Sequence, residues 1–237
     1  MKYTDVQKEL KKVSSLKRKK ANEWFFKTGK GEYGHGDKFI GVSMPNARKI
    51  AKSFTELPPA EVKKLLSSKI HEERMTALII LTLQYAGSPV VGQLAIYEFY
   101  LKNTKHINNW DLVDISAHKI IGAHLLKQKK ADRKILYKLA KSKDMWERRI
   151  AIVTTWQFIR EGQLDDTFKL SKELLNDKED LLHKAVGWML REAGKKDVKK
   201  LEAFLKANNK KMPRTALRYA IEKFGEKKRK AYLKGEV

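Results

Sequence analysis

The order of apolar and polar residues along the chain is that of a series of helices. Most of the five prolines and thirteen glycines fall between or at the ends of blocks dominated by Leu, Ala, Lys and Glu, which are good helix formers. No stretch of four or more residues combines period-two alternation with β-branched enrichment, so no strand is predicted. The blocks predict helices over residues 4–13, 15–28, 44–54, 59–67, 71–86, 89–102, 109–127, 132–141, 144–161, 164–176, 179–194, 197–207, 213–224 and 226–234. The expected fold class is therefore all-α.

Residues at the expected helix ends agree with these boundaries. Ser43 is suited to cap the third helix, and Pro45 fits its first turn, where a backbone N–H is not needed. Glu72 and Glu73 lie in the first turn of the fifth helix, where the helix dipole favours negative charge.

Four of the expected helices open on similar segments, in which a basic residue is followed within three positions by a small Ala. Ala77 and Ala151 are 74 residues apart, or two units of 37, and the next intervals, to Ala185 and Ala216, are 34 and 31 residues. A period of 31–37 residues fits an array of helical pairs close to the HEAT type. The pattern predicts one domain over residues 1–237, an α-α superhelix of HEAT-like repeats that is curved, with a concave basic face. Chance similarity among Ala- and Lys-rich helices is the alternative explanation.

The charge of the chain indicates a polyanionic partner. Lys and Arg number 52 and Asp and Glu 28, so the formal net charge is +24. A hydrophobic fraction of 42% excludes a fully disordered chain. The expected inner helices carry Arg74, Arg148, Arg149, Lys184, Arg191, Arg214 and Arg218. A concave basic groove matches a nucleic-acid duplex; a chain that is merely rich in lysine is the simpler alternative.

Cysteine is absent, which excludes disulfides, thiolate metal sites and a cysteine nucleophile. No apolar run approaches the roughly 18 residues of a membrane span, and residues 1–20 contain no apolar signal core. The expected location is the cytoplasm. The six histidines, among them His118 and His124, do not have a metal-binding spacing, so no metal is expected.

The segment from Gly29 to Gly36 matches the pattern G-x-G-x-x-G. A dinucleotide site needs a strand before this pattern and a helix directly after it. Here a helix precedes it and no strand is expected, so a flexible loop that contacts DNA through Lys27, Lys30 and Lys38 is the favoured interpretation.

A Trp and two acidic residues begin the helix expected over 109–127. Asn108 or Asn109 can cap this helix, and Asp111 lies where the helix dipole favours an anion. Asp114 follows Trp110 by four residues, so the two side chains share a helix face. In a chain this basic, Asp114 has either a chemical task or a buried ion pair with an inner Arg.

Two further Trp blocks follow, one around Trp146, 36 residues after Trp110, and one around Trp188, 42 residues after Trp146. Gly187, inside the second block, costs about 1 kcal/mol relative to Ala in a helix interior, which indicates that another group approaches closely there. A lone Trp at helical spacing usually fills a core, but three such blocks at similar intervals favour a shared role.

Together the three blocks resemble the alkylpurine DNA glycosylases built from HEAT-like repeats, the AlkD type. The matching residues are Trp110-Asp111-Leu112-Val113-Asp114, Trp146-Glu147-Arg148-Arg149-Ile150-Ala151 and Lys184-Ala185-Val186-Gly187-Trp188-Met189-Leu190-Arg191-Glu192. The resemblance implies that Trp110 and Trp188 face the lesion nucleotide and that Asp114 is the catalytic carboxylate. As DNA-binding residues the resemblance implies Arg149, with Arg148 as the alternative, and Phe25, with Trp24 as the alternative, while the match at Arg48 is looser. The basic residues of the expected inner helices that are added to them are Arg191, Lys184 and Arg214. The Gly-rich segment 29–38 departs from the family pattern.

The expected function is therefore that of a monofunctional glycosylase of base excision repair. It would hydrolyse the N-glycosidic bond of N3- or N7-alkylated purines in double-stranded DNA, as a monomer and without a cofactor. Two alternatives stay open: a non-catalytic HEAT-repeat protein that binds distorted or branched DNA, and a protein-binding scaffold.

Overall fold

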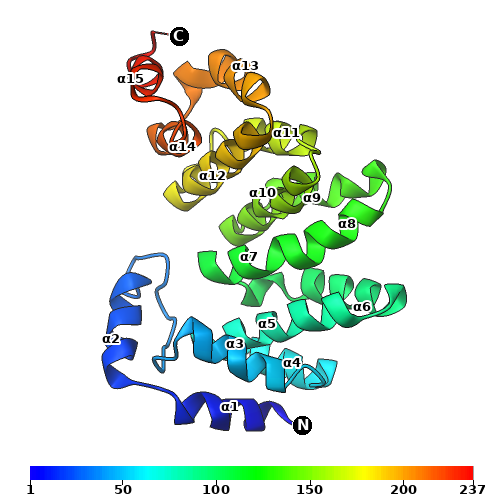
Figure 1. The fold of residues 1–237 in the computed structure, drawn as a ribbon. Helices are drawn as coiled ribbons and strands as arrows, with labels where there is room; N and C mark the ends of the chain where they lie inside the picture. The colour runs from blue at the N-terminus through cyan, green and yellow to red at the C-terminus, as the bar shows by residue number, and fades with distance from the viewer. Residues whose placement is uncertain (237) are drawn as a thin grey trace. The chain divides into compact units, whose positions relative to one another are not determined.

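The computed structural model describes residues 1–236, and helices form nearly all of its regular structure (Figure 1). They are α1 (Tyr3–Lys12), α2 (Leu16–Phe25), α3 (Met44–Ser53), α4 (Pro59–Leu66), α5 (His71–Gly87), α6 (Val90–Lys102), η1 (Thr104–His106), α7 (Trp110–Ala117), the π-helical turn η2 (His118–Gly122), α8 (Ala123–Lys127), η3 (Lys130–Arg133), α9 (Lys134–Ala140), α10 (Met145–Arg160), α11 (Asp165–Glu173), α12 (Asp180–Lys196), α13 (Val198–Asn208), η4 (Asn209–Lys211), α14 (Arg214–Ala220) and α15 (Glu226–Lys234). Within residues 1–236 there is no strand, only an isolated bridge between Lys38 and Ile70. The all-α prediction is confirmed.

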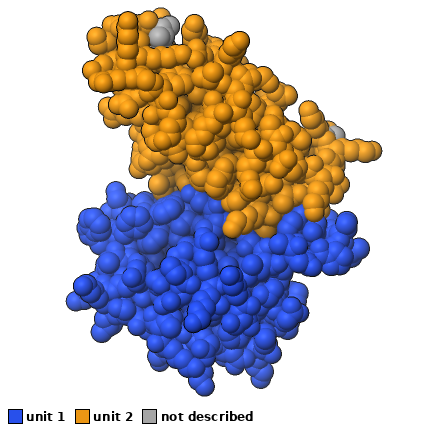
Figure 2. Space-filling model, in the orientation of Figure 1, with its two compact units in different colours: residues 1–116 blue, residues 117–237 orange. Residues whose placement is uncertain are grey.

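The chain divides into two compact units, residues 1–116 and 117–237 (Figure 2). The predicted curvature, the concave basic face and the single domain over residues 1–237 stay predictions.

In the first unit, α5 is the central helix. Helices α1, α3, α4 and α6 all pack against it. Every residue from His71 to Leu81 is buried, including four charged or titratable residues at the start of the helix. Because buried charges need partners, this end of α5 must be paired with groups from other elements.

In the second unit, α10 contacts α9, α11 and α12, and α12 packs closely on α14. Ala151, Ala185 and Ala216 are buried at these contacts, as the pattern of small residues predicts. A Cβ on Gly187 would lie 2.5 Å from the carbonyl oxygen of Ala216. The group that approaches Gly187 is therefore helix α14 of the chain itself.

Most helix boundaries agree with the sequence within a few residues, and three regions differ. The helix expected over 15–28 ends at Phe25, because Lys27 has a φ of 51° and the Gly-rich loop follows. The helix expected over 213–224 ends at Ala220. The helix expected over 109–127 contains the π-turn, a feature that helical periodicity does not predict. Ser43 caps α3 as predicted, accepting the Asn46 N–H.

Among the residues described, no helix is both long enough and apolar enough to cross a membrane.

Candidate active site

Helix α7 places Trp110 and Asp114 on one face, one turn apart, and both side chains are partly exposed. Asn109 begins the helix as one of the two predicted caps, and its Oδ1 accepts the Trp110 backbone N–H at 2.8 Å. The Trp110 indole N–H donates to the Tyr33 hydroxyl at 3.3 Å. The indole is therefore held at its polar edge as well as by the helix.

Two phenylalanines from the end of α2 and its following turn pack on this indole. The Phe26 ring stacks on Trp110 with centroids 5.5 Å apart and planes at 21°. The Phe25 ring meets it edge-on at 6.0 Å and stays 55% exposed. Trp24, the alternative to Phe25 at the sequence level, is 82% exposed. Of the two aromatic candidates, Phe25 is the one that contacts Trp110.

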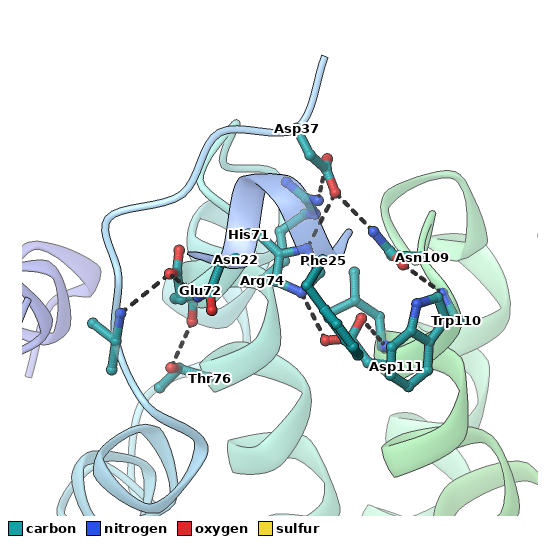
Figure 3. Close-up of polar contacts among 12 residues, drawn as sticks. Asn22, Phe25, Asp37, His71, Glu72, Arg74, Thr76, Asn109, Trp110 and Asp111 are labelled. Carbon is teal, nitrogen blue, oxygen red and sulfur yellow. Dashed lines mark hydrogen bonds and ion pairs between the residues drawn. The ribbon is translucent and has the colours of Figure 1, made fainter. Parts of the chain in front are cut away.

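Behind Trp110 lies a buried network of charged groups (Figure 3). The His71 ring bonds the Asp111 carboxylate through Nε2 at 2.8 Å and the Asp37 carboxylate through Nδ1 at 3.1 Å. Arg74 donates to the other Asp37 oxygen at 2.6 Å, and the Asn109 side-chain amide donates to Asp37 at 3.1 Å. Three elements, the Gly-rich loop, α5 and α7, are joined in this network.

The network shifts the pKa values of its members. Burial by itself lowers the pKa of His71, but the charge and hydrogen bond of Asp111 and the hydrogen bond of Asp37 outweigh it and raise that pKa to about 9. Burial raises the pKa of Asp37, and the hydrogen bond from His71 with the charge of Arg74 outweighs it, so the net pKa is lowered. At neutral pH the network therefore holds an imidazolium between carboxylates.

A third buried carboxylate, that of Glu72, secures the later part of the same loop. Glu72 accepts the backbone N–H groups of Ile40, Gly41 and Val42 at 2.8–3.2 Å, and the Asn22 amide at 3.3 Å (Figure 3). Glu72, in the first turn of α5, thus binds the loop and also interacts favourably with the helix dipole. The loop expected to be flexible is anchored at two points.

Nothing in the sequence predicts this network. Asp37, His71 and Asp111 are separated by 34 and 40 residues, and no local pattern relates them. The available signal was the group of titratable residues that opens an otherwise apolar helix. Arg74, expected on a DNA-facing surface, is 3% exposed and paired with Asp37, because the buried carboxylate needs a cation.

The other predicted Trp, Trp188, lies in the second unit and is half-buried. Its ring tilts against Trp156 at 5.1 Å, and Trp156 in turn contacts the His118 ring at 4.5 Å. Burial, with the charges of Lys119 and Arg160, lowers the pKa of His118 to about 4, so this imidazole is neutral at pH 7. Trp146, which begins the middle of the three Trp blocks, is buried in the core.

The two adjacent arginines of α10 have partners inside the second unit. Arg148 Nε donates to the Asp177 carboxylate at 2.6 Å and its side chain is mostly buried. Arg149 is 5% exposed and donates to the Leu181 carbonyl at 2.5 Å. Their contact with DNA stays a prediction.

The remaining predicted DNA-binding residues fall into two groups. Arg48 and Arg214 are exposed, and Arg214 donates to the Leu233 carbonyl at 2.7 Å. Lys184 pairs with Asp180 at 2.7 Å, and Arg191 pairs with Glu222. Arg48 and Arg214 are the more accessible to a polyanion.

The model of the family described as "DNA alkylation repair enzyme" matches residues 6–224. The chain belongs to this family. The family-level resemblance drawn from the three Trp blocks is confirmed, and the protein has a role in the repair of alkylated DNA.

Solved structures with a similar fold include one from Enterococcus faecalis. It is described as "Predicted DNA alkylation repair enzyme from Enterococcus faecalis", with a TM-score of 0.67 and 16% sequence identity, over 90% of this chain and 97% of that one. At that identity the likeness concerns the fold alone. No curated protein matches the chain.

Proposed function

We propose that the protein is a monofunctional DNA N-glycosylase that removes cationic N3- or N7-alkylated purines from double-stranded DNA. The observation that carries the proposal is the pairing of a carboxylate and an aromatic face on α7, Asp114 one turn after Trp110. Phe25, Phe26 and Tyr33 hold that indole in a defined orientation.

One carboxylate is enough for this reaction. The base of an N3- or N7-alkylated purine already carries positive charge and leaves as a neutral molecule, so no general acid is required, in contrast to sugar hydrolysis with its pair of carboxyl groups. What the enzyme must supply is negative charge beside the oxocarbenium-like sugar and a position for the attacking water. Asp114 can supply both.

Aromatic faces add to this stabilisation. The face of Trp110 is expected to stabilise a cationic sugar or base by about 0.5–2 kcal/mol. The same contribution from Trp188 is what the family resemblance implies. The charge of the lesion supplies much of the selectivity, so the proposal needs no deep apolar pocket.

The substitution Asp114→Asn tests the proposal. It preserves the size of the side chain and removes the charge, so release of 7-methylguanine or 3-methyladenine from methylated duplex should fall by about 10²-fold or more. Glu98→Gln is the control, since it removes a carboxylate of α6 whose side chain is 52% exposed; its rate should equal that of the wild type.

Two outcomes would contradict the proposal. The first is a wild-type protein that releases neither base at any salt concentration. The second is duplex binding that is equal in the wild type and in Asp114→Asn with no base release by either, which is the behaviour of a non-catalytic DNA-binding array.

A further inference from the structure

A buried histidine lies behind the candidate site, clamped between carboxylates of two other elements. His71 belongs to α5, whereas Asp37 belongs to the Gly-rich loop and Asp111 to α7. We propose that His71 is a positioning residue for Trp110. Its doubly protonated ring joins α7 to the loop between α2 and α3 (residues 26–43, which include the Gly-rich segment) and thereby holds the indole against Phe26. The inference rests on the proposed function, because it takes Trp110 to be part of the reacting site.

The hydrogen bonds require the charged form of the ring. A carboxylate only accepts, and a neutral imidazole donates from one nitrogen alone. Both nitrogens of His71 face carboxylate oxygens, at 3.1 Å and 2.8 Å, so both carry protons. The charged groups that face the ring are Asp37 from the loop, Asp111 from α7 and Arg74 from α5 itself. Two carboxylates are thus balanced by two cations in a buried site.

The network is linked to Trp110 through the backbone on both sides of that residue. Asp111, the next residue, accepts from His71. Asn109, the preceding residue, donates its side-chain amide to Asp37 and accepts the Trp110 N–H. A displacement of the clamp therefore displaces the first turn of α7.

A second link runs through aromatic rings. The His71 ring stacks on Phe39 at 4.6 Å and contacts Phe26 at 4.9 Å, and Phe26 stacks on Trp110 at 5.5 Å. Phe26 follows α2 directly, in the segment that Asp37 ties to α5. Loss of the charge on His71 leaves its ring with a single N–H, so one of the two carboxylates loses this donor and the tie between α7 and the loop that carries Phe26 weakens.

The Trp110 indole N–H offers a direct readout of position, because it donates to Tyr33. In a proton–nitrogen correlation spectrum of the whole protein, the Trp110 signal is assigned by its loss in Trp110→Phe. We expect this signal to shift on raising the pH, with a midpoint near the pKa of His71, about 9. The shift should be absent in His71→Gln and retained in His118→Gln, which alters a histidine of the other unit.

The kinetic test separates positioning from binding. His71→Gln should lower the single-turnover rate of base release at pH 7.5 by roughly 10-fold or more, since small displacements of reacting groups have large effects on rate. Its affinity for duplex DNA should stay within about 2-fold of the wild type, because the buried ring makes no DNA contact. Asp37→Asn keeps the side-chain shape and should move the midpoint of the Trp110 shift to lower pH.

The outcomes that would overturn the inference do not depend on glycosylase activity. They are a Trp110 signal in the wild type without a transition near pH 9, or the same transition persisting in His71→Gln. The wild-type titration needs Trp110→Phe for the assignment but no variant of His71, so a missing transition overturns the inference even where His71→Gln does not fold. If the wild type shows the transition but releases no base, the positioning stands and the proposed function fails.

Discussion

At the scale of single residues, the charge of His71 couples the folding of the first unit to pH. The pKa of His71 rises from its ordinary value of 6.5 to about 9 on folding, so the folded chain binds this proton more tightly than the unfolded chain does. The stabilisation is therefore complete below about pH 6.5 and is lost as the pH rises through about 9.

This coupling predicts a difference between the wild type and His71→Gln. The advantage of the wild type in free energy of unfolding should shrink by about 3 kcal/mol between pH 6 and pH 10. Urea unfolding at several pH values, followed by circular dichroism, measures it. A constant difference across this range would show that folding does not raise the pKa of His71.

The sequence predicts the relation between two residues correctly where they lie within one turn of the same helix. The i, i+4 relation of Trp110 and Asp114 follows from helix geometry. The choice between Phe25 and Trp24 needed the fold, since neighbouring positions at the end of α2 face different surroundings: Phe25 contacts Trp110, and Trp24 is 82% exposed.

At the scale of elements, the contact of α12 with α14 depends on the missing side chain of Gly187. An added Cβ would lie 2.5 Å from both the Ala216 carbonyl oxygen and the Tyr219 Cβ. Gly187→Ala should therefore destabilise the protein by about 1–3 kcal/mol in spite of its better helix propensity.

The matched control is Gly87→Ala at the end of α5, where a Cβ would meet nothing within 4 Å. This change should be neutral or stabilising by up to about 1 kcal/mol. Thermal unfolding of both variants checks the pair, and equal melting temperatures would contradict the steric argument.

Element boundaries were predicted best where the end signal is local, as at Ser43. They were predicted least well around the Gly-rich loop and the π-turn of His118–Gly122. In the turn, a Cβ on Gly122 would lie 2.7 Å from the Thr154 carbonyl oxygen, so the packing of α10 shapes this segment. Helical periodicity contains no information about such a neighbour.

At the scale of the whole molecule, the net charge of +24 is expected to favour association with DNA. Release of counterions from the duplex makes the logarithm of affinity fall steeply with the logarithm of salt concentration. Arg48→Gln should reduce the slope by about 1, because this exposed arginine is expected to contact a phosphate.

Lys102→Gln is the control, since Lys102 on α6 is exposed and pairs with Glu98. It removes the same charge, and its slope should match that of the wild type. Affinity measured by fluorescence anisotropy between 50 and 200 mM salt, a range chosen to resolve the slope, decides the matter. Binding that is absent or insensitive to salt would instead favour a protein-binding scaffold.

The sequence by itself determined the all-α fold class, the positions of most helices, the positive charge and the Trp110–Asp114 pair. Each depends on composition or on contacts within one helical turn, which the order of residues specifies directly. Only the tertiary structure decided that Arg74 is buried against Asp37, that α14 occupies the space beside Gly187, and that His71 lies between Asp37 and Asp111. These contacts join residues about 30 to 40 positions apart, and the packing of whole helices brings them together.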